Sequence, residues 1–275
     1  DTVTTGTGDD TVLGDHGEVF YNLDGSLSQA KSILTDQGGD DIIDAGDGDN
    51  LIIAGFASDT VTSGSGKDFI IGDSGIANFD TAGILTDTFT ISHALGDDDV
   101  IAAGSGGNVV IGGQGEDFIT STSEAGLRDI LLGDNAEVIL TNNIVTRFES
   151  TDLGDITGGD DVILGGNADT FAIGGTGLDI VTTGSGQDSI LGDHGRITYS
   201  NDGTLLRAES LHLDQGNVDT IIAGDGDNLV IAGFAGDSVT SGSGKDTIIG
   251  DNGIINQNNS GVITDAFTIS LDIGG

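Results

Sequence analysis

The chain has 275 residues, of which 46 are acidic and only 7 are Lys or Arg, so its formal net charge is −39 at pH 7. This negative field excludes nucleic acids and anionic membrane surfaces as natural partners, because both recruit Lys and Arg side chains. A mean hydropathy of +0.04, with 49 glycines and no Pro, Cys, Met or Trp, indicates a chain that folds and turns often without disulfides, rather than a disordered acidic tail.

The carboxylates constrain how such a chain can be stable. At this density they repel one another, and a compact state loses stability unless cations bind between them. Calcium, a hard cation, suits oxygen ligands. No apolar run approaches the length of a transmembrane helix, and the chain opens at Asp1 without a signal-like segment, so we expect any targeting signal to lie outside this sequence.

Residues 1–36 contain the end of one repeat unit and an insert. Gly6 to Val12 is the last motif of an incomplete unit. The insert that follows, EVFYNLDGSLSQAKSILTD, alternates polar and apolar residues around Asp24-Gly25. This pattern predicts a β-hairpin.

Residues 37–95 form the first complete unit and have a regular nine-residue step. In each step a glycine-rich turn precedes an acidic or amide residue and a short run of alternating aliphatics. Because strand side chains alternate between faces, every second aliphatic should point into a thin core. The predicted inward residues are Ile43, Ile52, Val61 and Ile70. The unit ends in a second insert, ANFDTAGILTDTFTIS, which also predicts a hairpin.

The same plan recurs, with irregularities, in residues 96–156, 157–214 and 215–275. A three-residue slip precedes Asp129, and the nine-residue step breaks again at Asp169. The insert RITYSNDGTLLRAESLHLD alternates around Asp202-Gly203 and predicts another hairpin. Leu271 to Gly275 begins a further unit, so we expect the chain to be part of a longer protein.

A longer period contains these units. The segment from Asp1, DTVTTGTGDDTVLGDHGEV, returns from Asp179 as DIVTTGSGQDSILGDHGRI, and Asn50 matches Asn228 at the same offset of 178 residues. A tag of Gly and Asp recurs every 58 to 61 residues, so three units make one long period. The tag aspartates are Asp15, Asp73, Asp134, Asp193 and Asp251. Such nested repetition predicts one continuous solenoid, in which each unit contacts its neighbours.

The nine-residue motif reads GxGxDxUx, where U is aliphatic. It is clear in GSGKDFII from Gly64, GQGEDFIT from Gly113, GSGQDSIL from Gly184 and GSGKDTII from Gly242. Apart from the inserts, nearly the whole chain resembles the RTX family of calcium-binding nonapeptide repeats. The resemblance implies an all-β fold, a parallel β-roll (β-solenoid) with 18-residue coils. It also implies a protein that a Gram-negative bacterium exports by type I secretion and that folds in extracellular calcium.

Two motifs make one coil, so residues 18 positions apart should lie above each other at about the 4.8 Å strand spacing. Asp41 then lies over Asp59, and Asn50 over Asp68. Two carboxylates about 4 Å apart repel by about 1 kcal/mol in water and about 4 kcal/mol at an effective dielectric of about 20, and a calcium ion between the turns reverses the sign. We therefore predict multiple Ca²⁺ sites. The predicted ligands are Asp10, Asp41, Asn50, Asp59, Asp68, Asp99, Asn108, Asp117, Asp161, Asp169, Asp179, Asp188, Asp219, Asn228, Asp237 and Asp246.

Some predicted sites depart from the motif. Asn replaces Asp at Asn50, Asn108 and Asn228, while Gln37 and Asn217 stand where Gly is expected. We expect calcium to bind weakly at these sites or not at all. The tag aspartates have two interpretations: each adds a calcium ligand, or each only shapes the turn before an insert.

The inserts carry the variable chemistry, including both tyrosines, Tyr21 and Tyr199. Their hairpins should project from one edge of the roll. There they either dock on other molecules, including copies of this chain, or cover part of the roll against edge-to-edge aggregation. His16 and His194 share a tag position that other units fill with Ser or Asn, so we expect them to be surface turn residues. No nucleophile elbow or catalytic triad stands out, and we do not expect an enzyme.

These patterns predict a structural and adhesive segment of a large secreted surface or fibre-forming protein. One alternative is a calcium-dependent roll attached to a secreted enzyme or toxin domain outside this sequence. A minor alternative is ice binding through outward threonines, although neighbouring coils present Asp44, Ala102 or Leu164 instead. The threonines are Thr4, Thr62, Thr120, Thr182 and Thr240.

Overall fold

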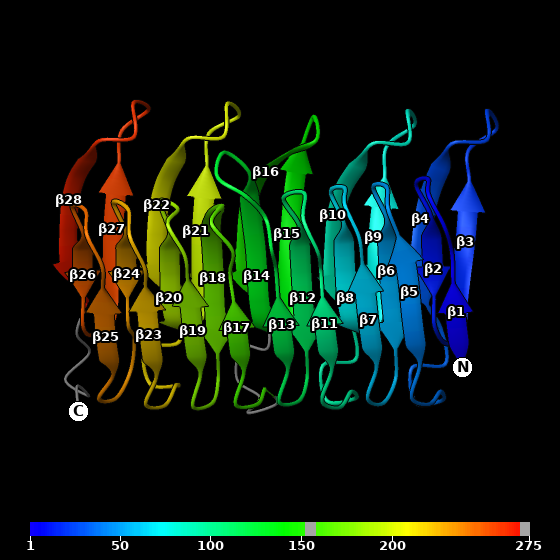
Figure 1. Cartoon of the computed structure of the whole chain (residues 1–275), viewed down its shortest axis with the longest axis horizontal. Coiled ribbons are helices and arrows are strands. Elements are labelled where there is room, and N and C mark those ends of the chain that lie inside the picture. Colours follow the sequence, from blue (N-terminus) through cyan, green and yellow to red (C-terminus); the bar gives the residue numbers. More distant parts are fainter. Residues whose placement is uncertain (152–157, 270–275) are drawn as a thin grey trace.

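The computed structural model describes residues 1–151 and 158–269, and in these ranges the chain forms 28 β-strands in three sheets. Two nine-stranded parallel sheets make a roll, and a ten-stranded antiparallel sheet packs on one of them (Figure 1). None of the described residues belongs to a helix that is long and apolar enough to cross a membrane. The further unit expected from Leu271 to Gly275 lies outside the described residues.

The first parallel sheet, here called the outer sheet, has one face in solvent. Its strands alternate exposed and buried residues, as in Thr60–Ser63. In sheet order the strands are β1 (Thr2–Thr4), β5 (Ile42–Gly46), β7 (Thr60–Ser63), β11 (Val100–Ala102), β13 (Phe118–Thr120), β17 (Val162–Leu164), β19 (Ile180–Thr183), β23 (Thr220–Ala223) and β25 (Ser238–Ser241). The alternation is that of a sheet with only one buried face.

The second parallel sheet, the middle sheet, is buried on both faces, and all five residues of Leu51–Gly55 are buried. In sheet order its strands are β2 (Thr11–Leu13), β6 (Leu51–Gly55), β8 (Phe69–Asp73), β12 (Val109–Gly113), β14 (Arg128–Asp134), β18 (Asp169–Gly175), β20 (Ser189–Asp193), β24 (Leu229–Ile231) and β26 (Thr247–Ile249). This explains why its strands are apolar runs rather than alternating sequences.

A thin aliphatic core fills the space between the outer and middle sheets. Ile43 and Val61 enter it from the outer sheet and Ile52 and Ile70 from the middle sheet, and each is at most 1% exposed. The inward positions predicted from the nine-residue motif are therefore confirmed. The parallel β-roll is confirmed as well.

The register of the outer sheet defines the coil. Ile43 lies opposite Val61, which follows it by one 18-residue coil. Val61 lies opposite Ile101, although an insert separates these two residues in the chain. Each insert thus leaves the roll and returns the chain to the next coil without disturbing the stack.

The inserts are β-hairpins, as predicted, and together they form the third sheet, here called the hairpin sheet. In chain order its strands are β3 (Gly17–Tyr21), β4 (Leu27–Ser32), β9 (Gly75–Phe79), β10 (Leu85–Thr90), β15 (Ala136–Thr141), β16 (Ile144–Ser150), β21 (Gly195–Tyr199), β22 (Leu205–Ser210), β27 (Gly253–Gln257) and β28 (Ile263–Thr268). Neighbouring hairpins pair with each other, for example β4 with β9 and β16 with β21.

The sequence suggested that the hairpins project freely from one edge of the roll, but they do not stand free there. Their inner face packs on the middle sheet and forms a second apolar core with it. Phe148 of β16 is fully buried there, with its ring 6.0 Å from that of Tyr199, which in turn meets Phe171 of the middle sheet at 5.4 Å. Only the hairpin tips extend past the upper edge of the roll in Figure 1. The physical reason is that each hairpin has one apolar face, which must be covered.

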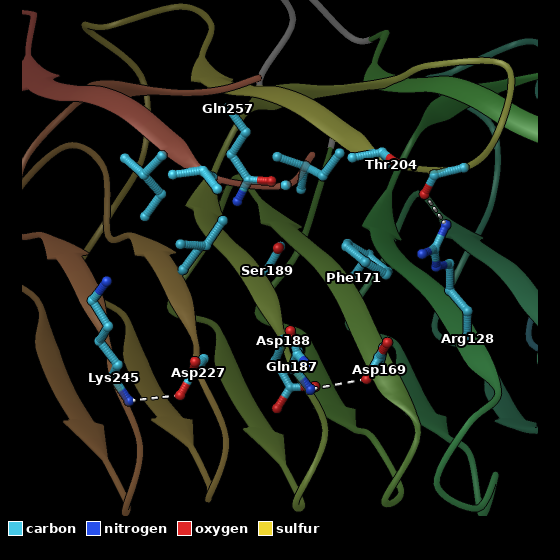
Figure 2. Close-up of a pocket in the computed structure, with 16 residues that line it drawn as sticks. Arg128, Asp169, Phe171, Gln187, Asp188, Ser189, Thr204, Asp227, Lys245 and Gln257 are labelled. Atoms are coloured by element: carbon cyan, nitrogen blue, oxygen red, sulfur yellow. Dashed lines mark hydrogen bonds between the residues drawn. The ribbon is translucent and has the colours of Figure 1, made fainter. Parts of the chain in front are cut away.

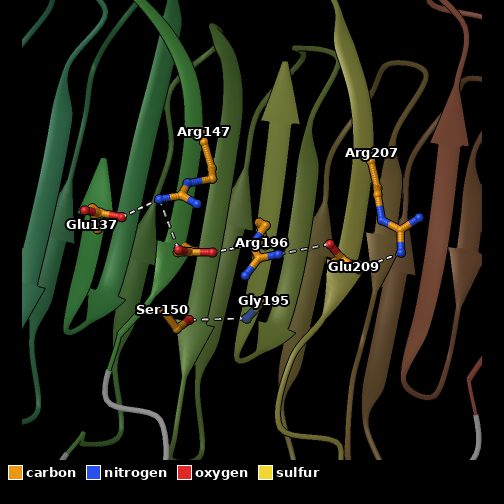
Figure 3. A network of polar contacts seen from close by, with 8 residues as sticks. Glu137, Arg147, Ser150, Gly195, Arg196, Arg207 and Glu209 are labelled. Atoms are coloured by element: carbon orange, nitrogen blue, oxygen red, sulfur yellow. Dashed lines mark hydrogen bonds and ion pairs between the residues drawn. The ribbon is translucent and has the colours of Figure 1, made fainter. Parts of the chain in front are cut away.

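Ion pairs run across neighbouring hairpins (Figure 3). Arg147 lies 2.6 Å from Glu137 and 3.4 Å from Glu149. Glu149 also contacts Arg196, which lies 3.7 Å from Glu209. These partly exposed pairs contribute about 0–1 kcal/mol each. They place the arginines of the hairpin sheet beside the few glutamates there, and so away from the aspartates of the roll.

Candidate metal sites

Two columns of polar residues follow the two edges of the roll. The first column consists of the residues that directly precede the outer strands, at the lower edge in Figure 1. Its members are Asp1, Asp41, Asp59, Asp99, Asp117, Asp161, Asp179, Asp219 and Asp237. The second column occupies the equivalent place at the middle strands, on the opposite edge. Its members are Asp10, Asn50, Asp68, Asn108, Asp129, Thr170, Asp188, Asn228 and Asp246.

Hydrogen bonds join successive members of each column. In the first column the backbone N–H of Asp41 donates to Oδ1 of Asp59 at 2.7 Å, and the N–H of Asp99 donates to Oδ1 of Asp117 at 2.8 Å. In the second, the N–H of Asn50 donates to Oδ1 of Asp68 at 2.9 Å. Asp41 and Asn50 therefore stack on Asp59 and Asp68 as the sequence predicted.

The second carboxylate oxygen of the first column has no hydrogen-bond donor although it is buried. This Oδ2 atom is unpaired in Asp41, Asp59, Asp99, Asp117, Asp161, Asp179, Asp219 and Asp237. Seven of these side chains are at most 3% exposed, and Asp237, near the end of the stack, is half-buried. A buried acceptor without a donor costs about 1–3 kcal/mol, and more when it is charged, so a column of them requires another partner.

Burial also changes the acidity of these groups. Desolvation raises the pKa of Asp59, Asp117 and Asp219 to about 7. Burial and the neighbouring carboxylates raise the pKa of Asp99 and Asp179 well above its usual range. The chain alone therefore does not stabilise a fully ionised first column at neutral pH.

The residues around these oxygens fit a calcium ion. A Cβ at Gly112 would lie 2.2 Å from Oδ2 of Asp117 and 2.4 Å from the carbonyl oxygen of Gly133. At Gly174 the corresponding distances are 2.4 Å to Oδ2 of Asp179 and 2.2 Å to the carbonyl oxygen of Gly192. The absent glycine side chains thus leave a space on which a carboxylate and a carbonyl oxygen converge, and calcium prefers such oxygen donors.

These donors do not form a compact acidic cluster. The described residues contain no group of three or more His, Cys, Asp or Glu side chains arranged around one point. A cation at this edge would take carboxylate oxygens from the column and complete its shell with carbonyl oxygens of the glycine turns and water.

The second column has the acidic and amide positions that the sequence predicted, with one exception. Thr170, and not Asp169, lies opposite Asp129 and donates its backbone N–H to Asp188 at 2.8 Å. Asp169 stands one residue earlier and accepts the N–H of Gln187 at 2.9 Å. The nine-residue step is therefore unbroken here, and the predicted slip is wrong. The slip before Asp129 is real, because 21 residues separate it from Asn108, whose N–H it accepts.

Two features of the columns were missed in the sequence. Asp1 belongs to the first column, since Thr2 pairs with Ile42, and counting nine residues back from Asp10 would have found it. Serine hydroxyls also reach the second column. Ser121 donates to Oδ2 of Asp129 at 2.7 Å, and Ser123 donates to its Oδ1 at 2.8 Å.

A tag aspartate accepts hydrogen bonds from two other turns, and so links three turns, its own included. Asp134 accepts the N–H of Gly159 at 3.2 Å and the hydroxyl of Thr176 at 2.9 Å. Asp15 accepts the N–H of Phe56 at 2.6 Å, and Asp73 accepts that of Gln114 at 2.5 Å. Asp193 repeats the arrangement through Asn217, whereas Asp251 is exposed. These contacts shape the turns, and a further role of the tags as calcium ligands stays a prediction.

The two tag histidines differ in environment. His16 is exposed, as expected, whereas His194 is only 1% exposed. Its ring lies 6.1 Å from that of His212, and desolvation together with this neighbour lowers the pKa of His194 to about 4. The prediction of a surface residue is therefore wrong for His194, which is a neutral buried group at neutral pH.

An open pocket of about 470 Å³ lies between the second edge and the hairpin sheet (Figure 2). Arg128 borders it, stacks on the rings of Phe171 and Tyr199 at 4.9 and 5.1 Å, and donates to the carbonyl oxygen of Gly203 at 3.0 Å. Lys245 lines the opposite side. Protein cations therefore lie near the second column.

Comparison with known proteins agrees with this geometry. The family described as RTX calcium-binding nonapeptide repeat (4 copies) matches more than half of the chain, at residues 1–18, 44–76, 93–123, 164–196 and 222–254. No curated protein and no solved structure matches the chain. The matched segments contain residues of both columns and glycine turns. The repeat is a structural calcium-binding unit that is typical of proteins secreted by Gram-negative bacteria. The chain belongs to the RTX calcium-binding nonapeptide repeat family.

Proposed function

We propose that this chain is a calcium-stabilised structural segment of a large secreted bacterial surface or fibre-forming protein. The column of buried aspartates whose Oδ2 atoms have no donor carries the proposal. In the absence of bound cations the mutual repulsion of these carboxylates opposes folding, and calcium between successive coils converts the repulsion into attraction. Several bound ions per chain are proposed, with the column aspartates and the turn carbonyls as ligands.

The shape of the stack supports a spacer role. The coils follow one another in chain order, and the first and last described strands, β1 and β28, lie at opposite ends of the stack (Figure 1). Each coil adds about 4.8 Å of length, so duplication of units increases reach without a new fold. Calcium outside the cell would make such a segment rigid after export through type I secretion.

The adhesive part of the proposal concerns a smaller surface than the sequence suggested, because the bodies of the hairpins are used in packing on the middle sheet. At the first hairpin tip, Leu23 is fully exposed and Tyr21 is 64% exposed. The tips and the outer face of the hairpin sheet are the surfaces we propose for contacts with other molecules, including copies of this chain.

Small-angle X-ray scattering of the chain in calcium and in chelator tests the spacer role. We expect a rod of fixed length and cross-section in calcium and an expanded chain in chelator. A flexible or variable particle in saturating calcium would contradict the proposed function. The same measurement on a tandem of two copies should show a proportional increase in rod length.

A further inference from the structure

The two edges of the roll have different compositions. Every neighbour of an Asp in the first column is another Asp, from Asp1 to Asp237. In the second column every neighbour of an Asp in the stack is neutral, as Asn50 and Asn108 are beside Asp68. The column itself thus offers a cation between coils two carboxylates at the first edge and only one at the second.

The asparagines of the second column donate hydrogen bonds to the carbonyl oxygens of their own turns. Nδ2 of Asn108 donates to the carbonyl oxygen of Ala103 at 2.8 Å, and that of Asn228 donates to Ala223 at 2.9 Å. Nδ2 of Asn50 donates to Gly48 at 3.0 Å and also to Oδ1 of Asp68 at 3.0 Å. Each amide therefore contacts the type of oxygen that a calcium ion would otherwise coordinate.

One aspartate of the second column is paired with hydroxyl groups. Asp129 uses both oxygens to accept hydrogen bonds from Ser121 and Ser123. Ser63 and Thr183 stand beside Asp68 and Asp188, although neither completes a hydrogen bond to Oδ2, which lacks a donor in both aspartates. At the first edge no Ser or Thr is found five residues before any Asp of the column.

The residue five positions before the column residue varies with it along most of the second column. A hydroxyl residue stands five positions before an Asp in the pairs Thr5 and Asp10, Ser63 and Asp68, Thr183 and Asp188, and Ser241 and Asp246. An alanine stands there before an Asn in the pairs Ala45 and Asn50, Ala103 and Asn108, and Ala223 and Asn228. The turn thus changes two residues together, and the hydroxyls of Thr5 and Ser63 donate to the carbonyl oxygens of Ala45 and Ala103 in the next coil.

Basic residues are distributed in the same unequal way. Lys67, Arg128 and Lys245 line the pockets beside the second column. The other four belong to strands of the hairpin sheet, namely Lys31, Arg147, Arg196 and Arg207. None of the seven Lys and Arg residues is in a turn of the first edge.

We propose that the cations that hold this roll together lie along the first column alone, and that the second column is held by the amide, hydroxyl and cationic groups of the chain itself. The inference rests on the proposed calcium binding and restricts it to one edge. The family motif, read uniformly, would place an ion at both edges. Asp68 and Asp188 of the second column also have a buried Oδ2 atom without a donor, but only at the first edge do such atoms belong to consecutive aspartates.

Calorimetric titration of the calcium-free chain with Ca²⁺ tests this proposal through two matched variants. Asp117→Asn and Asp68→Asn both keep the Oδ1 acceptor and remove one charge. We expect Asp117→Asn to bind fewer calcium ions and to need several-fold more calcium for folding, followed by circular dichroism. Asp68→Asn should keep the ion number and the folding midpoint of the parent chain. An equal loss in both variants would overturn the restriction to one edge and leave calcium binding intact.

A third variant keeps the test decisive if Asp117→Asn does not fold. Asn108→Asp places three consecutive carboxylates, 68, 108 and 129, in the second column. We expect it to bind an additional calcium ion and to be less stable than the parent in chelator. An unchanged ion number in Asn108→Asp, together with a loss in Asp68→Asn, would overturn the proposal. A parent chain that binds no calcium at all would instead refute the proposed function.

Discussion

The backbone N–H of Asp59 donates a hydrogen bond to Oδ1 of Asp99 at 2.7 Å, although the two residues are 40 positions apart and a complete hairpin lies between them. The same bond joins Asp41 to Asp59 within one unit, where the separation is 18. The first column is therefore continuous through every described insert, and a change at one aspartate affects the carboxylates before and after it.

Asp99→Asn should have opposite effects with and without calcium. The amide keeps the Oδ1 acceptor but removes a charge from between Asp59 and Asp117. In chelator the relief of repulsion should raise the free energy of unfolding by about 1 kcal/mol or more. In calcium the loss of a charged ligand should lower it by about 1–3 kcal/mol. Urea unfolding in calcium and folding induced by the osmolyte TMAO in chelator measure this, with Asp44→Asn, exposed on the outer sheet, as the control. Changes of the same sign in both conditions would contradict a role in cation binding.

The calcium-free fold should lose stability as the pH rises from about 4 to about 7. In the folded chain the pKa of Asp59, Asp117 and Asp219 is raised to about 7 by burial, whereas the unfolded groups release their protons near 4. The folded state then binds more protons throughout this window, and linkage makes it less stable with rising pH. Thermal unfolding in chelator at pH 5 and pH 8 measures the effect.

Higher stability at pH 8 than at pH 5 in chelator would contradict this prediction. The lowered pKa of His194 opposes this trend between about pH 4 and 6.5, but one group is outweighed by the three aspartates. The lowered pKa of Asp47 and Asp225 acts only below pH 4. In saturating calcium the decline should disappear, since calcium competes with protons for the same oxygens.

Much of the roll follows from the nine-residue period alone. The period determines which side chains enter the core, as with Ile43 and Ile101, and which aspartates stack. The period cannot determine where a hairpin packs. The alternation around Asp24-Gly25 indicates that the hairpin has an apolar face, but not which surface covers that face. The predicted column position at Asp169 is wrong because it followed the acidic side chain, whereas nine residues counted from Asp161 end on Thr170. The partners of the second column are hydroxyls and amides, which any turn can contain.

Gly112→Ala should weaken calcium binding, at a position whose φ angle an alanine can adopt. The new Cβ would lie 2.2 Å from Oδ2 of Asp117, in the space where the carboxylate and the carbonyl oxygen of Gly133 converge. Overpacking of this kind costs about 1–3 kcal/mol. The matched control is Gly6→Ala, where a Cβ meets nothing within 4 Å. Equal calcium affinity in both variants, measured by calorimetry, would argue against the proposed site.

Asp134→Ala should destabilise the roll in calcium and in chelator alike. The substitution leaves the N–H of Gly159 and the hydroxyl of Thr176 without their buried acceptor, at about 1–3 kcal/mol for each group. The exposed tag Asp251 provides the control, and its replacement by Ala should change stability little. Urea unfolding in calcium and TMAO-induced folding in chelator measure the stability of both variants. A loss for Asp134→Ala that occurs only in calcium would instead identify this tag as a ligand.

The most direct test of the whole account is a calcium titration of the chain, followed by circular dichroism and hydrodynamic radius, with magnesium as the control for charge screening. We predict a cooperative gain of β signal with compaction near about 0.1–1 mM calcium, and no comparable response to magnesium. A chain that is already folded in chelator and does not respond to calcium would contradict the central claim that bound cations stabilise the first column.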